Sequence, residues 1–264
     1  MKKALLVGIN YIGTKSELRG CINDMVNIKN FIKSEYSFDD YQIYTMHELS
    51  EDSKRIPTLQ NFKNAIEWLL KDCKSGDSLF FSYSGHGGSI KDKNGDESDG
   101  KDETLCFLDK NMVDDELKEI LIDKLPEGVN LVVIMDCCHS GSMCDLKYDY
   151  NIDYTNIKNT DNDDLKYSIT ISKKYKELNS NIVLISGCLD NQYSADTYEN
   201  GQNCGALTYS FLETIKKLKL KNKTLTYKNL MKNLLFFIKS KGYEQTPCIS
   251  SGKFINLEDK LNIL

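Results

Sequence analysis

Short apolar runs alternate with longer amphipathic stretches along this chain, and this alternation constrains the fold more than any other feature of the sequence. Apolar runs rich in Val, Ile and Phe are typical of buried strands. They occur at Ala4–Ile9, Gln42–Met46, Ser78–Ser84, Thr104–Leu108, Asn130–Asp136 and Asn181–Ser186. The stretches between and after them predict helices at Asn23–Ser34, Leu59–Cys73, Asp114–Lys124, Leu207–Lys219 and Tyr227–Lys241. Strands that alternate with helices predict an α/β fold, with a mostly parallel central sheet flanked by helices on both faces.

Two polar segments interrupt this pattern. Lys91–Glu103 is strongly charged and predicts a loop. Leu146–Asn181 is rich in Asn, Asp, Tyr and Lys, although Tyr167–Ile171 within it predicts a short edge strand. The chain has 264 residues and only three prolines, so no Pro-rich linker marks a domain boundary. We therefore expect one domain over residues 1–264, with a polar insertion at about 146–181.

The overall composition excludes several classes of protein. With 34 Lys and Arg against 39 Asp and Glu, the net charge is −5, which argues against a nucleic-acid-binding module. No stretch approaches 18 consecutive apolar residues, so we expect no membrane span. The apolar start is too short for a signal peptide. Nine cysteines without a CxxC pair suit a reducing compartment, so the sequence predicts a cytoplasmic protein.

Two of the expected strands end in glycine turns that carry reactive side chains. The first runs into a turn that contains His86, and the second runs into a turn that contains Cys138. Carboxyl ends of parallel strands meet at one edge of a sheet. A Cys nucleophile needs a base, and later an acid for the leaving amine, and one imidazole can do both. If the strands are neighbours, His86 can serve Cys138, with the amides of Gly87 and Cys138 as oxyanion donors.

Each of these elements also has an ordinary structural explanation. A His in a glycine turn is often only solvated, and a single Cys is more often a core residue than a nucleophile. The two together, 52 residues apart at the ends of two buried strands, form a far more specific pattern. A His about 50 residues upstream of the nucleophile is a known feature of caspases.

Tyr83–Gly87 (YSGHG) and Asp136–Gly141 (DCCHSG) resemble the catalytic motifs of metacaspases, which are caspase-like cysteine proteases. Further matches extend the resemblance over nearly the whole chain, at Ala4–Asn10, Leu18–Asp24, Val113–Glu116, Ser186–Asp196 and Gly205–Tyr209. The QAC signature of mammalian caspases is absent, so an aspartate-specific caspase is not expected. The resemblance implies a caspase-like fold, with Cys138 as nucleophile, His86 as base and no N-terminal prodomain.

The resemblance also implies which residues select the substrate. It places Cys21, Asp24, Ser84 and Asp136 around the side chain that precedes the scissile bond. A desolvated carboxylate needs a cationic partner, so this pocket fits cleavage after Arg or Lys. From the sequence alone, Asp24 is equally well explained as a helix N-terminal residue stabilised by the helix dipole.

Many metacaspases require calcium, and the aspartates that bind it in the family match Asp102, Asp114, Asp115 and Asp145. Carboxylate oxygens are the ligands that this hard cation prefers, and we expect a weakly bound, activating Ca2+. The alternative is a solvated acidic loop, with Asp114 as the cap of the helix that follows it.

The function that best fits these features is a calcium-dependent cysteine endopeptidase acting on proteins or peptides with Arg or Lys before the scissile bond. The resemblance implies a monomer. Self-processing is a further hypothesis, because the insertion carries Lys158, Lys166, Lys173, Lys174 and Lys176; these lysines otherwise only keep it soluble. Two alternatives remain, namely a catalytically silent caspase-fold scaffold and another cysteine-dependent hydrolase or acyltransferase.

Overall fold

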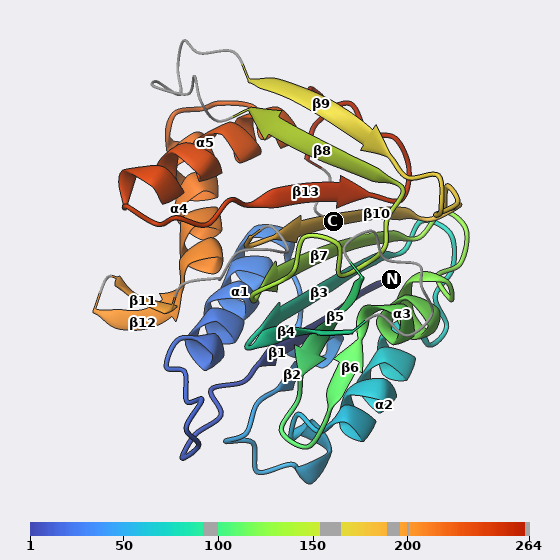
Figure 1. Ribbon diagram of the computed structural model, residues 1–264, viewed down its shortest axis with the longest axis vertical. Helices are drawn as coiled ribbons and strands as arrows, with labels where there is room; N and C mark the ends of the chain where they lie inside the picture. The colour runs from blue at the N-terminus through green and yellow to red at the C-terminus, as the bar shows by residue number, and fades with distance from the viewer. Residues whose placement is uncertain (92–99, 154–164, 189–195, 200, 262–264) are drawn as a thin grey trace.

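The computed structural model of the chain describes residues 1–91, 100–153, 165–188, 196–199 and 201–261. Its centre is an eight-stranded sheet in the order β2-β1-β3-β7-β10-β13-β8-β9 (Figure 1). The strands are β1 (Lys2–Gly8), β2 (Ile43–Met46), β3 (Ser78–Ser84), β7 (Asn130–Asp136), β8 (Tyr148–Asp153), β9 (Lys166–Ile171), β10 (Asn181–Ser186) and β13 (Cys248–Ser251). Pairing is parallel from β2 to β10 and antiparallel from β10 to β9. The expected α/β class with a mostly parallel sheet is confirmed.

Helices cover both faces of this sheet. One face carries α1 (Cys21–Tyr36), α4 (Ala206–Leu220) and α5 (Tyr227–Ser240), and the other carries α2 (Leu59–Leu70) and α3 (Asp114–Leu117) (Figure 1). Two short 3-10 turns, η1 (Asp40–Gln42) and η2 (Ser53–Arg55), flank β2. The described residues include no helix that is long and apolar enough to cross a membrane.

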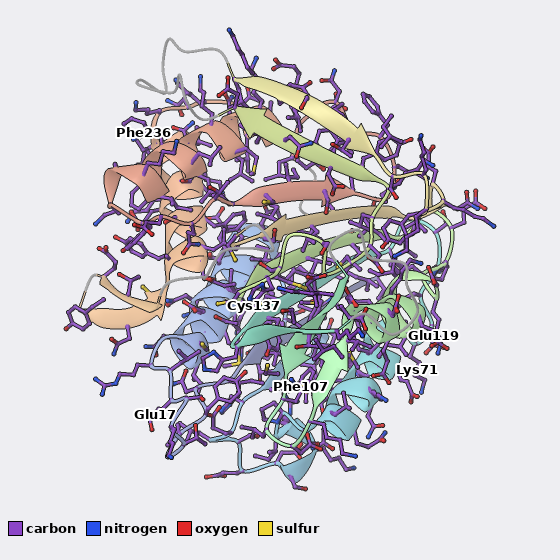
Figure 2. All side chains as sticks on the ribbon, viewed as in Figure 1. Glu17, Lys71, Phe107, Glu119, Cys137 and Phe236 are labelled. Atoms are coloured by element: carbon purple, nitrogen blue, oxygen red, sulfur yellow. The ribbon has the colours of Figure 1, made fainter. Side chains whose placement is uncertain are left out.

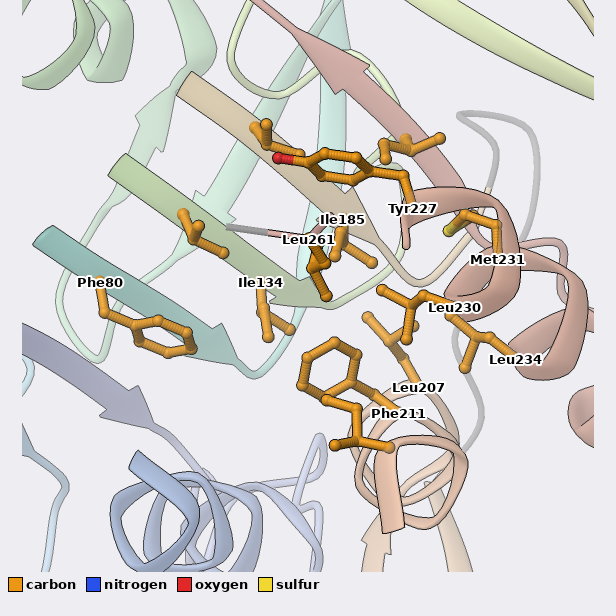
Figure 3. Packing of buried hydrophobic residues seen from close by; sticks show 14 of the residues in the cluster. Phe80, Ile134, Ile185, Leu207, Phe211, Tyr227, Leu230, Met231, Leu234 and Leu261 are labelled. Carbon is orange, nitrogen blue, oxygen red and sulfur yellow. The ribbon is translucent and has the colours of Figure 1, made fainter. Parts of the chain in front are cut away.

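Alternation along the strands divides the hydrophobic core into two clusters. Successive side chains of a strand point to opposite faces of the sheet. In β1, for example, Ala4 and Leu6 join the cluster under α1, α4 and α5, whereas Leu5 and Val7 join the cluster under α2 and α3. Figure 3 shows the first cluster from close by, where side chains of β3, β7 and β10 meet those of α4 and α5. Burial on both faces explains why these strands are continuous apolar runs in the sequence.

The helix expected over Asp114–Lys124 is only partly regular. α3 covers four residues and passes into a π-helical turn, η3 (Lys118–Ile122). Leu117, Leu121 and Ile122 are all buried in the same core cluster. A π turn widens the helix locally, and here it accompanies the burial of all three side chains.

Two expectations about the segment between β3 and α3 are wrong. The strand expected at Thr104–Leu108 does not join the central sheet, because β4 (Gly87–Lys91), β5 (Lys101–Cys106) and β6 (Asn111–Val113) form a separate antiparallel sheet. The expected loop at Lys91–Glu103 contributes the end of β4 and the start of β5, and residues 92–99 lie outside the described part. The charged sequence was misleading because Asp102 and Glu103 are buried in this small sheet.

The polar insertion contributes two strands to the edge of the central sheet. In β8, buried Tyr148, Tyr150 and Ile152 alternate with more polar residues, as expected for a strand with one covered face. The short edge strand expected at Tyr167–Ile171 is confirmed as β9. A further hairpin, β11 (Asp196–Glu199) and β12 (Gln202–Gly205), leads directly into α4.

Candidate active site

The turns that carry His86 and Cys138 leave the sheet side by side. β3 and β7 are neighbouring parallel strands whose last residues, Ser84 and Asp136, pair with each other. His86 and Cys138 each lie two residues beyond that pair. A Cβ atom on Gly87 would lie 1.9 Å from the carbonyl oxygen of Cys138, so the two turns are in direct backbone contact. The structure thus brings both turns together at the carboxyl end of the sheet, near Cys137 in Figure 2.

The His86 ring is held by a backbone carbonyl from a distant loop. Its Nε2 lies 2.7 Å from the carbonyl oxygen of Ser16, in the segment between β1 and α1. A carbonyl only accepts hydrogen bonds, so in the neutral imidazole Nε2 carries the proton and Nδ1 is the basic nitrogen. The Tyr11 ring packs against the imidazole, with 4.6 Å between ring centroids. The contact from Ser16 had no signal in the sequence.

Two buried tyrosines fix the backbone on either side of His86. The amide of His86 donates to the Tyr11 hydroxyl at 2.9 Å, and that hydroxyl donates to the carbonyl of Cys106 at 2.7 Å. The Tyr83 hydroxyl lies 2.9 Å from the carbonyl oxygen of His86 and 2.8 Å from that of Cys106. Burial raises the pKa of both tyrosines, so both hydroxyls remain protonated donors. Sequence reasoning overlooked this role, although Tyr83 belongs to the YSGHG motif.

The adjacent thiols Cys137 and Cys138 occupy different environments. Cys137 is 1% exposed and packs in the core cluster under α2, and burial raises its pKa well above the usual range. Cys138 is half-buried and lies in the turn against Gly87. A thiolate must form for the thiol to act as a nucleophile. The environment therefore disfavours Cys137 as the nucleophile and leaves Cys138 as the accessible thiol.

Three of the four residues expected around the substrate side chain form a buried acidic cluster. Asp24, Ser84 and Asp136 are at most 5% exposed, and the Ser84 hydroxyl donates to Asp24 Oδ2 at 2.6 Å. A Cβ atom on Gly205 would lie 2.2 Å from Asp136 Oδ2 and 2.8 Å from Asp24 Oδ2. Both carboxylates therefore border the same glycine. Cys21, the fourth residue, is buried at the start of α1 and lies within electrostatic range of Tyr11.

Backbone donors at the start of α4 face these carboxylates. The amide of Gly205 donates to Asp24 at 2.9 Å, and the amide of Thr208 donates to Asp136 Oδ2 at 2.8 Å. Carboxylates at a helix N-terminus are stabilised by its free N–H groups and dipole. Asp24 also lies in the first turn of α1, so the structural explanation considered for it applies together with its place in the cluster. Sequence reasoning missed Gly205 and Thr208 as partners, although both lie in the matched motif Gly205–Tyr209.

The expected calcium ligands come from three separate segments. Asp102, Asp114 and Asp145 are each at most 4% exposed, and Asp115 is half-buried. Asp114 Oδ2 accepts the amide of Glu103 at 3.2 Å, which ties α3 to β5. Burial raises the pKa of Cys144, and the nearby charges of Asp145 and Asp114 raise it further. Among the residues that the structure covers, no group of three or more acidic, His or Cys side chains is arranged to hold a metal ion. Three buried carboxylates nevertheless match the chemistry of a hard cation.

The alternative explanation of Asp114, as the cap of the helix that follows it, is only partly supported by the structure. α3 begins at Asp114 itself and Val113 occupies the N-cap position, without a side-chain cap. Asp114 Oδ1 accepts from the amide of Asp115 at 2.8 Å. Its carboxylate therefore stabilises the first turn of α3 as well as the contact to β5.

Four of the five lysines considered for self-processing are exposed, namely Lys166 at the start of β9 and Lys173, Lys174 and Lys176 after it. Lys158 lies outside the described residues. The hydroxyl of Tyr175, within this run, donates to Asp145 Oδ1. The lysine-rich segment therefore contacts one of the expected calcium ligands.

The matching family model and the curated relatives belong to the same family. Residues 2–147 match the model of the metacaspase, peptidase C14 domain. Metacaspase-1 of Schizosaccharomyces pombe is 35% identical over 94% of this chain and 67% of its own length. Metacaspase-1 of Saccharomyces cerevisiae is 36% identical over 97% of this chain and 67% of its own length.

Solved structures share the fold. A crystallised protein of Geobacter sulfurreducens superposes with a TM-score of 0.66 at 26% identity, covering 98% of this chain and 97% of that one. Caspase-1 from Spodoptera frugiperda superposes with a TM-score of 0.57 at 13% identity, covering 100% and 92% of the two chains. The central sheet and its helices are therefore arranged as in caspases.

Proposed function

Because the chain belongs to the metacaspase family of cysteine peptidases (peptidase C14), we propose that it is a calcium-activated endopeptidase that cleaves proteins after Arg or Lys. The observation that carries this proposal is the pair of buried carboxylates next to the two turns. Asp136 lies two residues before Cys138, and Asp24 accepts a hydrogen bond from Ser84, which lies two residues before His86. Buried carboxylates favour a cationic side chain over a neutral one, because a cation adds charge-assisted hydrogen bonds that a neutral side chain cannot supply.

The proposed chemistry uses one thiol and one imidazole. His86 Nδ1 takes the proton of Cys138, and the thiolate attacks the carbonyl carbon of the peptide bond. The amides of Gly87 and Cys138 donate to the oxyanion, and their turns are in direct contact. The imidazolium then gives its proton to the leaving amine, and the Ser16 carbonyl stabilises the charged ring through Nε2–H. Water, activated by the neutral His86, releases the acyl group from Cys138.

Asp102, Asp114, Asp115 and Asp145 would hold the cation. When bound, Ca2+ supplies positive charge that offsets these carboxylates. Since they belong to β5, α3 and the segment after β7, a cation shared by them would tie these segments together. Substituting Asp114→Asn should weaken calcium binding at least about tenfold in a titration calorimeter. Asp123→Asn, on an exposed acid after η3, is the matched control.

A peptide assay separates the proposal from its alternatives. Wild type, Cys138→Ala and Cys137→Ala are incubated with fluorogenic peptides ending in Arg, Lys or Asp, with and without millimolar calcium. We expect calcium-dependent cleavage of the Arg and Lys peptides by the wild type, and total loss in Cys138→Ala. Cys137→Ala, which keeps the accessible thiol, should retain activity. An inactive wild type would favour the scaffold alternative, and cleavage after Asp alone would contradict the role of Asp24 and Asp136.

Self-processing in the insertion is part of the proposal, supported by the exposure of Lys166, Lys173, Lys174 and Lys176. Wild type should fragment in calcium, and Cys138→Ala should stay intact. Mass spectrometry of the fragments identifies the cleaved lysine. Fragmentation of the Cys138→Ala protein would rule out both self-processing and the assignment of the nucleophile.

We further propose a monomer that acts in a reducing compartment such as the cytoplasm. The strands β8 and β9 extend the sheet beyond β13, and edge strand β9 begins with an exposed lysine, which discourages edge-to-edge pairing. All nine cysteines are described as thiols rather than disulfides. Light scattering coupled to gel filtration tests the monomer, and a dimer mass would contradict it.

A further inference from the structure

Cys106, which the proposed peptidase mechanism does not use, lies beside the catalytic turns. It is the last residue of β5 and is half-buried. Its amide donates to the carbonyl of His86 at 3.1 Å, which continues the β4–β5 pairing by one more residue. Residues opposite each other in an antiparallel pair have Cβ atoms about 4.5–5.5 Å apart on the same face. The Cys106 side chain therefore lies next to the His86 side chain.

A second contact relates the same thiol to the stretch of β4 that meets the Cys138 turn. A Cβ atom on Gly88 would lie 3.9 Å from Cys106 Sγ, while a Cβ atom on the preceding Gly87 would touch the Cys138 carbonyl. Both cysteines thus border the same short stretch of β4, Gly87 and Gly88, with the Cys138 carbonyl and Cys106 Sγ on opposite faces of the strand because successive Cβ atoms alternate. In addition, burial raises the pKa of Cys106, and an electrostatic interaction with Cys138 raises it further, so the two thiols are within electrostatic range. Cys106 therefore pairs with His86, and Cys138 contacts the next residue along the chain, Gly87.

We infer that Cys106 and Cys138 form a reversible disulfide under peroxide, and that this bond switches the peptidase off. The inference rests on the proposed function, since it takes Cys138 as the reactive thiol. The Cys138 thiolate attacks one oxygen of hydrogen peroxide, the O–O bond breaks, and the leaving hydroxide takes up a proton as water. The Cys106 thiolate then attacks the sulfenic sulfur and displaces its hydroxyl group, which leaves with the Cys106 proton as a second water. Two thiols and one peroxide give one disulfide and two waters.

Two other cysteines also lie near Cys138, and the structure makes each a poorer partner. Cys137 is directed into the apolar core and is 1% exposed. Cys188 is fully buried, and its Sγ donates to the carbonyl of Cys137 at 3.3 Å and lies 4.0 Å from the Ser140 hydroxyl. Burial raises the pKa of Cys188 to about 11. Cys106 is the half-buried thiol of the three, so it needs the least rearrangement to reach a sulfenic acid on Cys138.

Peptide mapping tests this inference without relying on enzyme activity. The full chain is treated with equimolar hydrogen peroxide, remaining thiols are alkylated, and the digest is read by mass spectrometry without reduction. We expect a cross-linked peptide pair that contains Cys106 and Cys138, and its loss after dithiothreitol. The inference is overturned if Cys138 is linked to Cys188 or Cys137 instead of Cys106, or if no disulfide forms at Cys138.

Reversibility provides the second measurement. Dithiothreitol should restore the activity of the oxidised wild type, because a disulfide protects Cys138 from further oxidation. In Cys106→Ser treated with excess hydrogen peroxide, a second peroxide oxidises the sulfenic acid on Cys138 to sulfinic acid and is itself reduced to water. Dithiothreitol does not reverse this step, so recovered activity should be at least roughly tenfold lower than in the wild type under the same treatment. Cys73→Ser is the matched control, since this half-buried thiol lies near Lys3 and Asp77 at the opposite edge of the sheet. Equal recovery in Cys106→Ser and wild type contradicts the inference.

The experiments distinguish a failure of the proposed peptidase function from a failure of the proposed Cys106–Cys138 disulfide. A wild type that cleaves Arg peptides but forms no link at Cys138 keeps the proposed function and rejects the disulfide. A wild type that cleaves no peptide but still links Cys106 to Cys138 rejects the proposed function and keeps the reactive pair.

Discussion

Replacing Gly87 by Ala adds one methyl group at the contact between the two catalytic turns. Gly87 has no left-handed backbone conformation, so an alanine meets no intrinsic backbone strain there. Its Cβ atom, however, would lie 1.9 Å from the carbonyl oxygen of Cys138, where ordinary contacts begin near 3.4 Å. The turns must therefore separate by about 1.5 Å. The alanine keeps its amide N–H, so any loss of rate reports the position of the turn rather than the loss of a donor.

The size of the effect follows from this displacement. Overpacking of this kind costs about 1–3 kcal/mol, which corresponds to a fall in Tm of roughly 2–12 °C for a domain of this size. Misplacing reacting groups by about 1 Å costs on the order of a hundredfold in rate. We therefore expect kcat/KM for an Arg peptide to fall at least about a hundredfold in Gly87→Ala, much more than the loss of stability explains at 25 °C.

The neighbouring glycine supplies the control. A Cβ atom on Gly88 meets the Thr104 hydroxyl at 3.1 Å, and a hydroxyl on a side chain can rotate away where a backbone carbonyl cannot. Gly88→Ala should therefore cost less than about 1 kcal/mol and less than about tenfold in kcat/KM. The assays are steady-state cleavage, thermal unfolding and the alkylation rate of Cys138 by iodoacetamide. Equal kinetics for the two variants would refute the inferred contact between the turns.

Three other perturbations have defined outcomes. Gly205→Ala should raise KM for an Arg peptide about tenfold or more, because the added methyl group collides with Asp136 and Asp24. The alkylation rate of Cys138 should stay unchanged. An unchanged KM would contradict the role of these two carboxylates in binding the substrate. Hydrogen bonds from Lys241 and Tyr243 lower the pKa of Glu199 below its usual 4.5. The ionised Glu199 therefore stabilises the folded protein above pH 4.5, and this stabilisation is lost as the pH falls through the pKa of Glu199 in the folded state. Thermal unfolding of wild type and Glu199→Gln should therefore differ at pH 7 and converge under acid, whereas a constant difference would reject the linkage. Phe62→Ala, at a fully buried ring that contacts Phe81 and Phe107, should cost about 3–5 kcal/mol and lower Tm on the order of 10 °C; Leu220→Ala, at a side chain that is 77% exposed, should change little.

The hydrophobic pattern along the chain was sufficient to predict the strands that form the centre of the sheet. The bounds expected for Ser78–Ser84 and Asn130–Asp136 agree with β3 and β7, because burial on both faces makes each strand a continuous apolar run. The order of these strands places His86 and Cys138 at the same edge, as expected. Short strands such as β4 and β6 escaped detection, since their pairing with β5 depends on partners and not on their own composition.

By itself, the sequence determined the α/β class, the two glycine turns and the residue types that carry the chemistry, because these depend on periodicity and on neighbours along the chain. Only the tertiary structure decided what surrounds them. The Ser16 carbonyl reaches His86 from 70 residues away, Gly205 meets Asp24 from 181 residues away, and Cys106 lies opposite His86 through a hairpin. Contacts at such separations are set by how helices and strands pack together, and no local pattern in the chain encodes them.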